Sequence, residues 1–309
     1  MTSISPGRGP GAGTYRAVGV LLAVVSILAF SIRPIFIKLA YSYVTDPITL
    51  LALRMIFSLP FLLAAAWWTQ RGSRVRLRPK DLGTVFVLGC LGYYLASFLD
   101  FLGLQYVGAG IGRLILFVYP TLVVILSAVF LKKPVKRRDV IALAVTYAGV
   151  ALVASRYLGG ENANFFLGAM LVFGSATAYA VYLVIGSHVV HSIGSMRFAA
   201  YATSVAGMMA ILQFFALRPV SALDLPWQVY GLAVLIAVVS TVIPIFMTAE
   251  ALKRIGANDV AMIGALGPVS AIFLGYLGLD ETLTLVQVAG AVLVLAGVLL
   301  VTLKPSAGK

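Results

Sequence analysis

Long apolar stretches, separated by short polar segments, occupy almost the whole chain. They lie at about 17–41, 48–68, 82–104, 108–131, 138–155, 165–187, 197–217, 228–252, 258–279 and 284–303. A helix of roughly 20 apolar residues crosses the hydrocarbon core of a bilayer and satisfies its own backbone hydrogen bonds there. The pattern therefore predicts an all-α membrane protein with ten transmembrane helices.

The composition supports this fold class. Of the 309 residues 61% are hydrophobic and 11% are charged, and the mean hydropathy is +1.03. Soluble domains are nearer half apolar and a quarter charged. Ten spans use about 200 residues, which leaves short loops and no room for a soluble domain. Residues 1–16, rich in Gly and Pro, are expected to form a disordered segment before a retained first helix, and 304–309 a short C-terminal tail.

The basic residues predict the orientation of the spans. The formal net charge of +13 would suggest nucleic-acid binding in a soluble protein. Here the Lys and Arg residues gather in alternate connecting segments, chiefly 71–80, 132–138 and 253–254, and near both termini. Such a bias marks the cytoplasmic side, so the N- and C-termini are predicted to be cytoplasmic and nucleic acid is not an expected partner. "RGSRVRLRPK" (71–80) is then a topology anchor, with binding to anionic membrane lipids as the alternative.

The chain also contains an internal repeat. Adding 148 to the residue number aligns 100–153 with 248–301 without a gap. The identical pairs include Leu104 with Leu252, Gly108 with Gly256, Ala109 with Ala257, Pro120 with Pro268, Leu131 with Leu279, Gly149 with Gly297 and Leu152 with Leu300. Because five helices is an odd number, the second copy enters the membrane from the opposite side. The sequence thus predicts two inverted-topology five-helix repeats, 17–155 and 165–303, which is typical of secondary transporters with a substrate site near the midplane.

The paired glycines and prolines are candidates for close packing and bending. Gly108 and Gly256 lie at helix starts, where a missing side chain permits close helix contact. Pro120 and Pro268 can loosen the backbone where helices must bend. Ordinary helix packing is the alternative at each of these four positions.

Motifs in both units resemble those of a known family. The first unit reads "LAFSIRPIFIKLAY…ITLLALRMIF…LQYVGAGIGRLILFVYPTLVVILSAVFLKK", and the second reads "LGAMLVFGSATAYAVYLV…AEALKRIGANDVAMIGALGPVSAIFLGYLGLDETLT…GAVLVLAGVLL". The shared features are Lys38, Arg54 in "ALR", Pro120, Pro268 and Glu281 in "LDE". These segments are similar to the EamA family of the drug/metabolite transporter superfamily, and the resemblance covers about 17–303.

The resemblance carries expectations about fold and function. It implies ten helices around a central cavity, transport of small metabolites, amino acids or drugs, often outward, and a place in the bacterial inner (plasma) membrane. The chain departs from the family where Phe30-Ser31 replaces a Trp-Gly pair and where Lys132-Lys133 replaces an acidic end of the fourth helix. These departures concern the substrate more than the fold.

Four charged residues fall inside predicted spans. Arg33, Arg54, Asp100 and Arg113 would each cost roughly 2.5–3.5 kcal/mol at the bilayer centre, so they are expected to face the interior, pair with one another or snorkel. At 1.5 Å per residue, Asp100 and Arg113 both lie roughly 6–8 Å below the outer boundary of neighbouring helices. Equal depth on adjacent helices predicts an intramembrane ion pair between Asp100 and Arg113.

The remaining arginines and the aromatic residues suggest a substrate site. We expect Arg54, with Arg33, to attract or bind an anionic group such as a carboxylate, because a guanidinium holds a carboxylate bidentately. Contacts with lipid headgroups or backbone carbonyls are the alternative. The candidate lining residues of the cavity are Tyr93, Tyr94, Tyr119, Tyr179 and Tyr182, although tyrosines at membrane interfaces are common without function.

Other function classes find little support. His188 and His191 have a ligand-like spacing, but no Cys and no obvious carboxylate joins them, so no metal site is expected. The chain has no nucleophile motif and no phosphate-binding loop; an enzyme, a cofactor and ATP-driven transport are therefore not expected. The predicted function is a secondary transporter of small molecules that works by alternating access, and an uncoupled facilitator or channel is the alternative. Protons as the coupling ion and a homodimeric assembly are left open.

Overall fold

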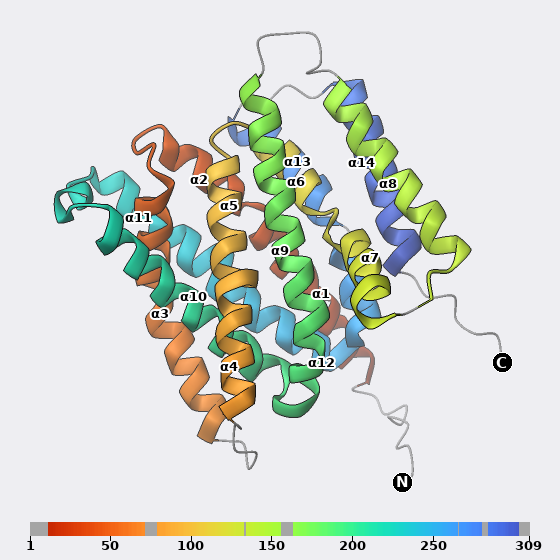
Figure 1. Ribbon diagram of the computed structural model, residues 1–309, viewed down its shortest axis with the longest axis horizontal. Helices are drawn as coiled ribbons and strands as arrows, with labels where there is room; N and C mark the ends of the chain where they lie inside the picture. The colour runs from red at the N-terminus through yellow and green to blue at the C-terminus, as the bar shows by residue number, and fades with distance from the viewer. Residues whose placement is uncertain are drawn as a thin grey trace.

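The computed structural model describes residues 12–71, 79–132, 134–155, 163–264, 266–279 and 284–302. Within these ranges the regular elements are all helices (Figure 1). Eight helical segments are long and apolar enough to cross a membrane, and two shorter apolar helices, Leu266–Leu279 and Leu285–Leu300, follow them. The expected all-α membrane protein is thus confirmed, with eight full-length candidate spans among the described residues.

The helices of the two halves follow one another in a similar order, but the break between α1 and α2 has no counterpart in α9. The first half comprises α1 (Ala12–Ser31), α2 (Arg33–Tyr41), α3 (Pro47–Arg71), α4 (Pro79–Leu88), the π-helix η1 (Gly89–Leu95), α5 (Ala96–Gly103), α6 (Ala109–Leu116), α7 (Tyr119–Leu131) and α8 (Arg137–Ser155). The second half comprises α9 (Ala163–Ile193), α10 (Ser195–Leu217), the 3₁₀ turn η2 (Val220–Leu223), α11 (Trp227–Ala237), the π-helix η3 (Val238–Val242), α12 (Ile243–Gly264), α13 (Leu266–Leu279) and α14 (Leu285–Thr302).

Prolines interrupt several of the helices near their middle. The chain leaves the helix between α1 and α2 just before Pro34, and between α6 and α7 just before Pro120. Proline has no N–H to donate to the carbonyl group one turn earlier, so it kinks or breaks many helices, although Pro60 lies inside the continuous α3. Pro268, the counterpart of Pro120, lies in the first turn of α13. Pro120 therefore opens a helix, and residue 265, before α13, lies outside the described part.

The two glycines that the repeat pairs, Gly108 and Gly256, each precede a helical stretch and have non-helical backbone angles. Gly108 precedes α6 with φ −63° and ψ 157°. Gly256 has φ 83° and ψ 169° and divides α12 into two helical stretches. Of these two positions only Gly256 has a positive φ, at which a Cβ would be strained, so this position favours glycine. The counterpart positions thus serve the same purpose with different backbone geometry.

The contact between α8 and α14 shows the relation between the two halves. A Cβ added to Gly149 would lie 2.7 Å from the carbonyl oxygen of Gly290, and a Cβ added to Gly297 would lie 2.7 Å from the carbonyl oxygen of Ala142. Adding 148 turns residue 142 into 290 and 149 into 297, so the second contact is the first one with the halves exchanged. The two helices lie side by side at one flank of the molecule (Figure 1).

Other contacts also join a helix of one half to a helix of the other half. α1 of the first half packs on α12 of the second, and α9 of the second half packs on η1 and α5 of the first. α3 packs on its counterpart α10, and α6 on its counterpart α13. Each half therefore closes the interior of the other, and the site described below lies between them.

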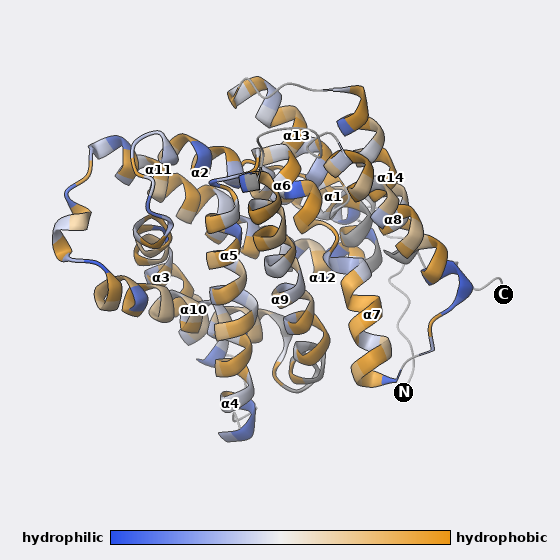
Figure 2. Cartoon of the chain, turned by 45° about the horizontal axis from the view of Figure 1, so that its top comes forward, coloured by the Kyte–Doolittle hydropathy of each residue, from blue (hydrophilic) through white to orange (hydrophobic). Residues whose placement is uncertain are grey.

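The helices are largely hydrophobic along their length, with hydrophilic residues concentrated at helix ends and connecting segments (Figure 2). One such end is held by a charged cap. Asp46 accepts hydrogen bonds from the backbone N–H of Thr49 (3.1 Å) and from its hydroxyl (2.6 Å), directly before Pro47 opens α3. This is the combination of an acidic N-cap and a first-turn proline that favours a helix start. Arg218, which follows α10, binds the same carboxylate through two nitrogens, each at 2.9 Å.

The ion pair and hydrogen bonds of Asp46 predict that the stability of the fold falls at acidic pH. Burial alone would raise the pKa of Asp46, but the hydrogen bonds from Arg218 and Thr49 outweigh it and hold that pKa below its ordinary value. Because the pKa is lower in the folded protein, the carboxylate stabilises the fold above the unfolded pKa, and this contribution is lost as the pH falls through the folded pKa. We expect the unfolding temperature in detergent to fall less between pH 6 and pH 3 for Asp46→Asn than for the wild type. An equal fall in both proteins would contradict the role given to Asp46.

Candidate substrate site

The charged residues inside the helices gather around one ion pair. The Nη2 atom of Arg33, at the start of α2, lies 2.9 Å from Oδ2 of Asp100 in α5. The side chains are only 14% and 6% exposed, so the pair is well shielded from solvent. An ion pair of this kind replaces part of the hydration that each charge loses inside the protein.

The structure pairs Asp100 with Arg33 instead of the expected Arg113. Counting depth along helices puts Asp100 and Arg113 at one level, but it does not show which way each side chain turns. The interruption before Pro34 starts a new helix at Arg33 and brings its guanidinium to Asp100. Arg113 lies in α6 within electrostatic range of both members of the pair, and it is partly exposed.

Arg54 is the most deeply buried of the three arginines. Its residue is 3% exposed. The Nε atom donates to Oγ1 of Thr241 at 3.2 Å, and Nη1 donates to Oγ of Ser97 at 3.4 Å. The guanidinium also lies over the ring of Phe101, 5.5 Å from its centroid. Since Thr241 belongs to η3, Arg54 of the first half is bound directly to the second half. Thr241, Ser97 and Phe101 are all uncharged.

A cluster of tyrosines lies beside the arginines. Tyr179 of α9 contacts Tyr119 of α7 at a centroid distance of 5.1 Å, Tyr182 at 5.8 Å and Tyr93 of η1 at 6.3 Å. Tyr93 and Tyr182 are 5.0 Å apart, and Tyr182 stacks on Phe198 at the same distance. Tyr93, Tyr119 and Tyr179 remain partly exposed, so they border space that water-sized molecules can reach. Four of the five candidate tyrosines are therefore brought together.

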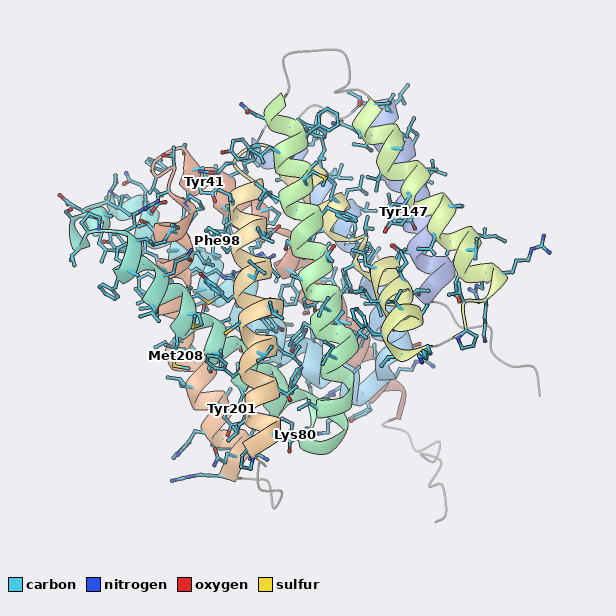
Figure 3. The ribbon with its side chains drawn as sticks, viewed as in Figure 1. Tyr41, Lys80, Phe98, Tyr147, Tyr201 and Met208 are labelled. Atoms are coloured by element: carbon cyan, nitrogen blue, oxygen red, sulfur yellow. The ribbon has the colours of Figure 1, made fainter. Side chains whose placement is uncertain are left out.

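The fifth candidate, Tyr94, stands apart. Its ring stacks on that of Phe98 at 6.5 Å and an interplanar angle of 11°, one turn along the same run of helix. Phe98 lies toward the end of the bundle where Tyr41 is found (Figure 3). The Tyr41 hydroxyl donates to the carbonyl oxygen of Phe101 at 2.7 Å, which holds α2 against α5. Because neighbouring residues of a helix point about 100° apart, Tyr93 and Tyr94 cannot both face the cluster.

The local sequence explains how these side chains reach one place. Arg33, Tyr93, Tyr119 and Thr241 all lie at a helix break or within a π-helix. A break or a π-bulge turns the following side chains relative to a straight helix, and π-bulges are frequent at functional sites. At η1, a Cβ added to Gly92 would lie 2.1 Å from Cβ of Tyr182, so a larger residue would displace that tyrosine.

The sequence interpretation missed the neutral partners of the charged groups. Ser97, Phe101 and Thr241 complete the surroundings of Arg54. Small hydroxyl residues in apolar helices are a usable signal, because a hydroxyl buried there needs a hydrogen-bond partner. Which partner it finds depends on helix rotation, which one sequence does not give.

The described side chains contain no group of three or more His, Cys, Asp or Glu residues placed to hold a metal ion. The side chains of His188 and His191 and the whole of Glu281 lie outside the described part of the structure. The basic stretch 72–78 and the terminal segments 1–11 and 303–309 also lie outside it.

Comparison with known proteins gives the family. The model of the EamA-like transporter family matches residues 17–155 and 166–303, one match for each half. The chain belongs to the EamA-like transporter family. The resemblance seen in the sequence motifs is thereby confirmed. This EamA-like protein is a multi-pass membrane transporter and not an enzyme, and its bacterial relatives indicate the plasma (bacterial inner) membrane.

Individual relatives of this EamA-like chain carry more specific names. The uncharacterized transporter YcbK of Bacillus subtilis is 32% identical over 283 residues, which cover 89% of each chain. The threonine/homoserine exporter RhtA of Salmonella typhimurium is 27% identical over 203 residues, covering 65% of this chain and 64% of RhtA. A solved crystal structure with 18% identity has a TM-score of 0.64 over 92% of this chain and 98% of its own, which shows the fold alone.

Proposed function

We propose that this protein is a secondary transporter that exports small metabolites, such as amino acids or related organic acids, by alternating access between two inverted repeats. The observation that carries the proposal is the shielded group of three arginines and one aspartate beside four tyrosines, at the contact of the two halves. Transporters built from inverted repeats bind their substrates near the midplane between the repeats. The name of the relative RhtA, a threonine/homoserine exporter, agrees with an amino-acid substrate.

The proposal includes ten spans with both termini in the cytoplasm. The extended Gly256 ends the eighth span, and the helical residues from 257 through α13 make the ninth, although residue 265 is outside the described part. α14 makes the tenth. The alternation of basic connecting segments favours cytoplasmic termini.

The charge of the site favours an anionic group on the substrate. Three guanidinium groups face one carboxylate, so the protein itself leaves a positive excess. Arg54 and Arg33 attract the anionic group, and Tyr93, Tyr119, Tyr179 and Tyr182 contact the rest of the molecule. A guanidinium suits a carboxylate because its planar donors match both oxygens.

The two π-helices are the elements at which we propose that the halves bend. Adding 148 to the bounds of η1 gives 237–243, which contains η3, so the π-helices occupy equivalent places. Ser26 of α1 donates to the carbonyl oxygen of Pro244, just after η3, at 3.0 Å, and Ser175 of α9 donates to that of Ala96, just after η1, at 2.6 Å. The two acceptors are counterparts at the offset of 148 and the two serines are 149 residues apart, so each hydrogen bond joins the first helix of one repeat to the third span of the other.

An efflux experiment tests the proposal. Proteoliposomes are loaded with a mixed pool of amino acids and small acids, and their loss is followed by mass spectrometry with and without an imposed pH gradient. We expect selective loss of one class of solute. Arg54→Gln is expected to reduce that loss about tenfold or more, because hydrogen bonds with charged groups contribute roughly 1.5–3 kcal/mol. No selective loss from folded wild-type protein would contradict the proposed function.

The uncoupled facilitator is the second candidate, and one contact favours it. Asp100 is already held in a shielded ion pair with Arg33, so this carboxylate is not free for a coupling ion. Efflux that is selective but indifferent to the pH gradient would identify a facilitator. Acceleration by the gradient would identify proton exchange.

A further inference from the structure

Two donors in the arginine cluster lack an acceptor. The Nε atom of Arg33 is buried without a hydrogen-bond partner. In the part of the chain that the structure describes, the guanidinium of Arg113 makes no hydrogen bond and no ion pair, and it is partly exposed. Buried donors normally have partners, because an unmade hydrogen bond costs free energy. Within the described part of the chain neither donor has a protein acceptor, so both are open to an acceptor on a ligand.

The charges in the cluster also favour the binding of an anion. Asp100 compensates Arg33, and the hydroxyls of Ser97 and Thr241 accept two of the five N–H donors of Arg54. Among the described residues neither Arg54 nor Arg113 has a counter-charge in contact, and of these two only Arg113 is partly exposed. An uncompensated charge is costly in an apolar interior, and a bound anion removes that cost.

The two open donors belong to neighbouring helices. Arg33 begins α2 and Arg113 lies in α6, which packs on α2, and the two guanidinium groups are within electrostatic range of each other. Tyr119 and Tyr179 are within electrostatic range of Arg113 as well. Like charges repel, so an anion shared between the two guanidinium groups is favourable.

We propose that a carboxylate of the transported molecule binds between Nε of Arg33 and the guanidinium of Arg113. The inference rests on the proposed transport function and assigns the direct contact to these two residues. Arg54 then has a positioning role, since it is only 3% exposed and its Nε joins α3 to η3.

The substrate class that fits is a free amino acid. Its carboxylate takes the two open donors, and its ammonium group lies over the tyrosine rings, whose faces attract cations. A simple organic acid would use the arginines only, and an amine without a carboxylate would leave them open. Free amino acids and simple organic acids both carry the carboxylate that would bind the two arginines.

The test compares matched solutes in proteoliposomes of the full-length protein. The pool contains the proteinogenic amino acids, the amino alcohols that lack the carboxylate, and the hydroxy acids that lack the ammonium group. We expect the wild type to release one or more amino acids at least about tenfold faster than the matching alcohols. Faster release of hydroxy acids than of amino acids would overturn the amino-acid assignment and leave the carboxylate site standing.

Variants then locate the carboxylate contact. Arg113→Gln is expected to slow amino-acid release about tenfold or more, and Arg113→Lys to restore part of it, because lysine keeps the charge and loses the fork. Arg218→Gln is the matched control, since it removes a guanidinium that binds Asp46 away from the cluster, and it is expected to behave as wild type. Wild-type release by folded Arg113→Gln would overturn the inference.

The outcomes separate the inference from the function on which it rests. If the wild type releases amino acids and their alcohols equally, transport stands and the carboxylate site fails. If it releases nothing from the pool, the proposed function fails together with the site. If Arg113→Gln does not fold, the carboxylate site is still tested by comparing the release of amino acids and amino alcohols by the wild type.

Discussion

Replacing Asp100 by asparagine is expected to lower the free energy of unfolding by about 3–5 kcal/mol, because it leaves Arg33 shielded and unpaired. The two side chains are 14% and 6% exposed, so water cannot readily replace the lost partner. The measurement is chemical unfolding of the purified protein in mixed micelles. The double variant Arg33→Gln/Asp100→Asn is expected to recover more than half of the loss, since it removes both charges.

A double-mutant cycle identifies the partner of Asp100. The coupling energy between Arg33→Gln and Asp100→Asn is expected to be the larger one, and the matched cycle with Arg113→Gln serves as the comparison. Arg113 has the same charge and lies near the pair, but without a direct contact. A larger coupling of Asp100 with Arg113 than with Arg33 would show that the pair is formed as depth counting along the helices suggested.

Hydrophobic length was enough to predict most of the fold. The apolar runs correspond to helices throughout the described ranges, since the bilayer imposes one length and one type of structure on a span. The repeat was visible because Gly149 and Gly297 stand at matching places, and both prove to be points of close backbone contact. Breaks such as those at η1 and η3 were not visible, because a π-helix has no composition of its own.

The sequence indicated which charged residues lie in the interior, but not which of them are in contact. Interior charges are rare in spans, so Arg33, Arg54, Asp100 and Arg113 could be selected by type, and they do gather in one region. Which arginine meets Asp100 depends on the turn of the chain before Pro34. The direction of each tyrosine likewise depends on helix rotation, so Tyr94 could not be separated from its neighbours by sequence alone.

The close contact of α8 with α14 gives the second large effect. Gly297→Ala would put a Cβ 2.1 Å from Oγ1 of Thr146 and 2.7 Å from the carbonyl oxygen of Ala142. The hydroxyl can rotate away, but the backbone carbonyl cannot, so the helices must separate. We expect a loss of about 1–3 kcal/mol in unfolding free energy, the usual cost of overpacking, measured by chemical unfolding in mixed micelles.

The relation between the halves sharpens this prediction. Gly149→Ala makes the counterpart contact at 2.7 Å and is expected to cost about the same, within 1 kcal/mol. Gly231→Ala in α11 is the control, because no atom lies within 4 Å of the added Cβ and alanine favours a helix. Separating α8 from α14 once relieves both clashes, so the double variant should cost less than the two single changes together. Full additivity, or a loss for only one glycine, would show that the two contacts are not equivalent.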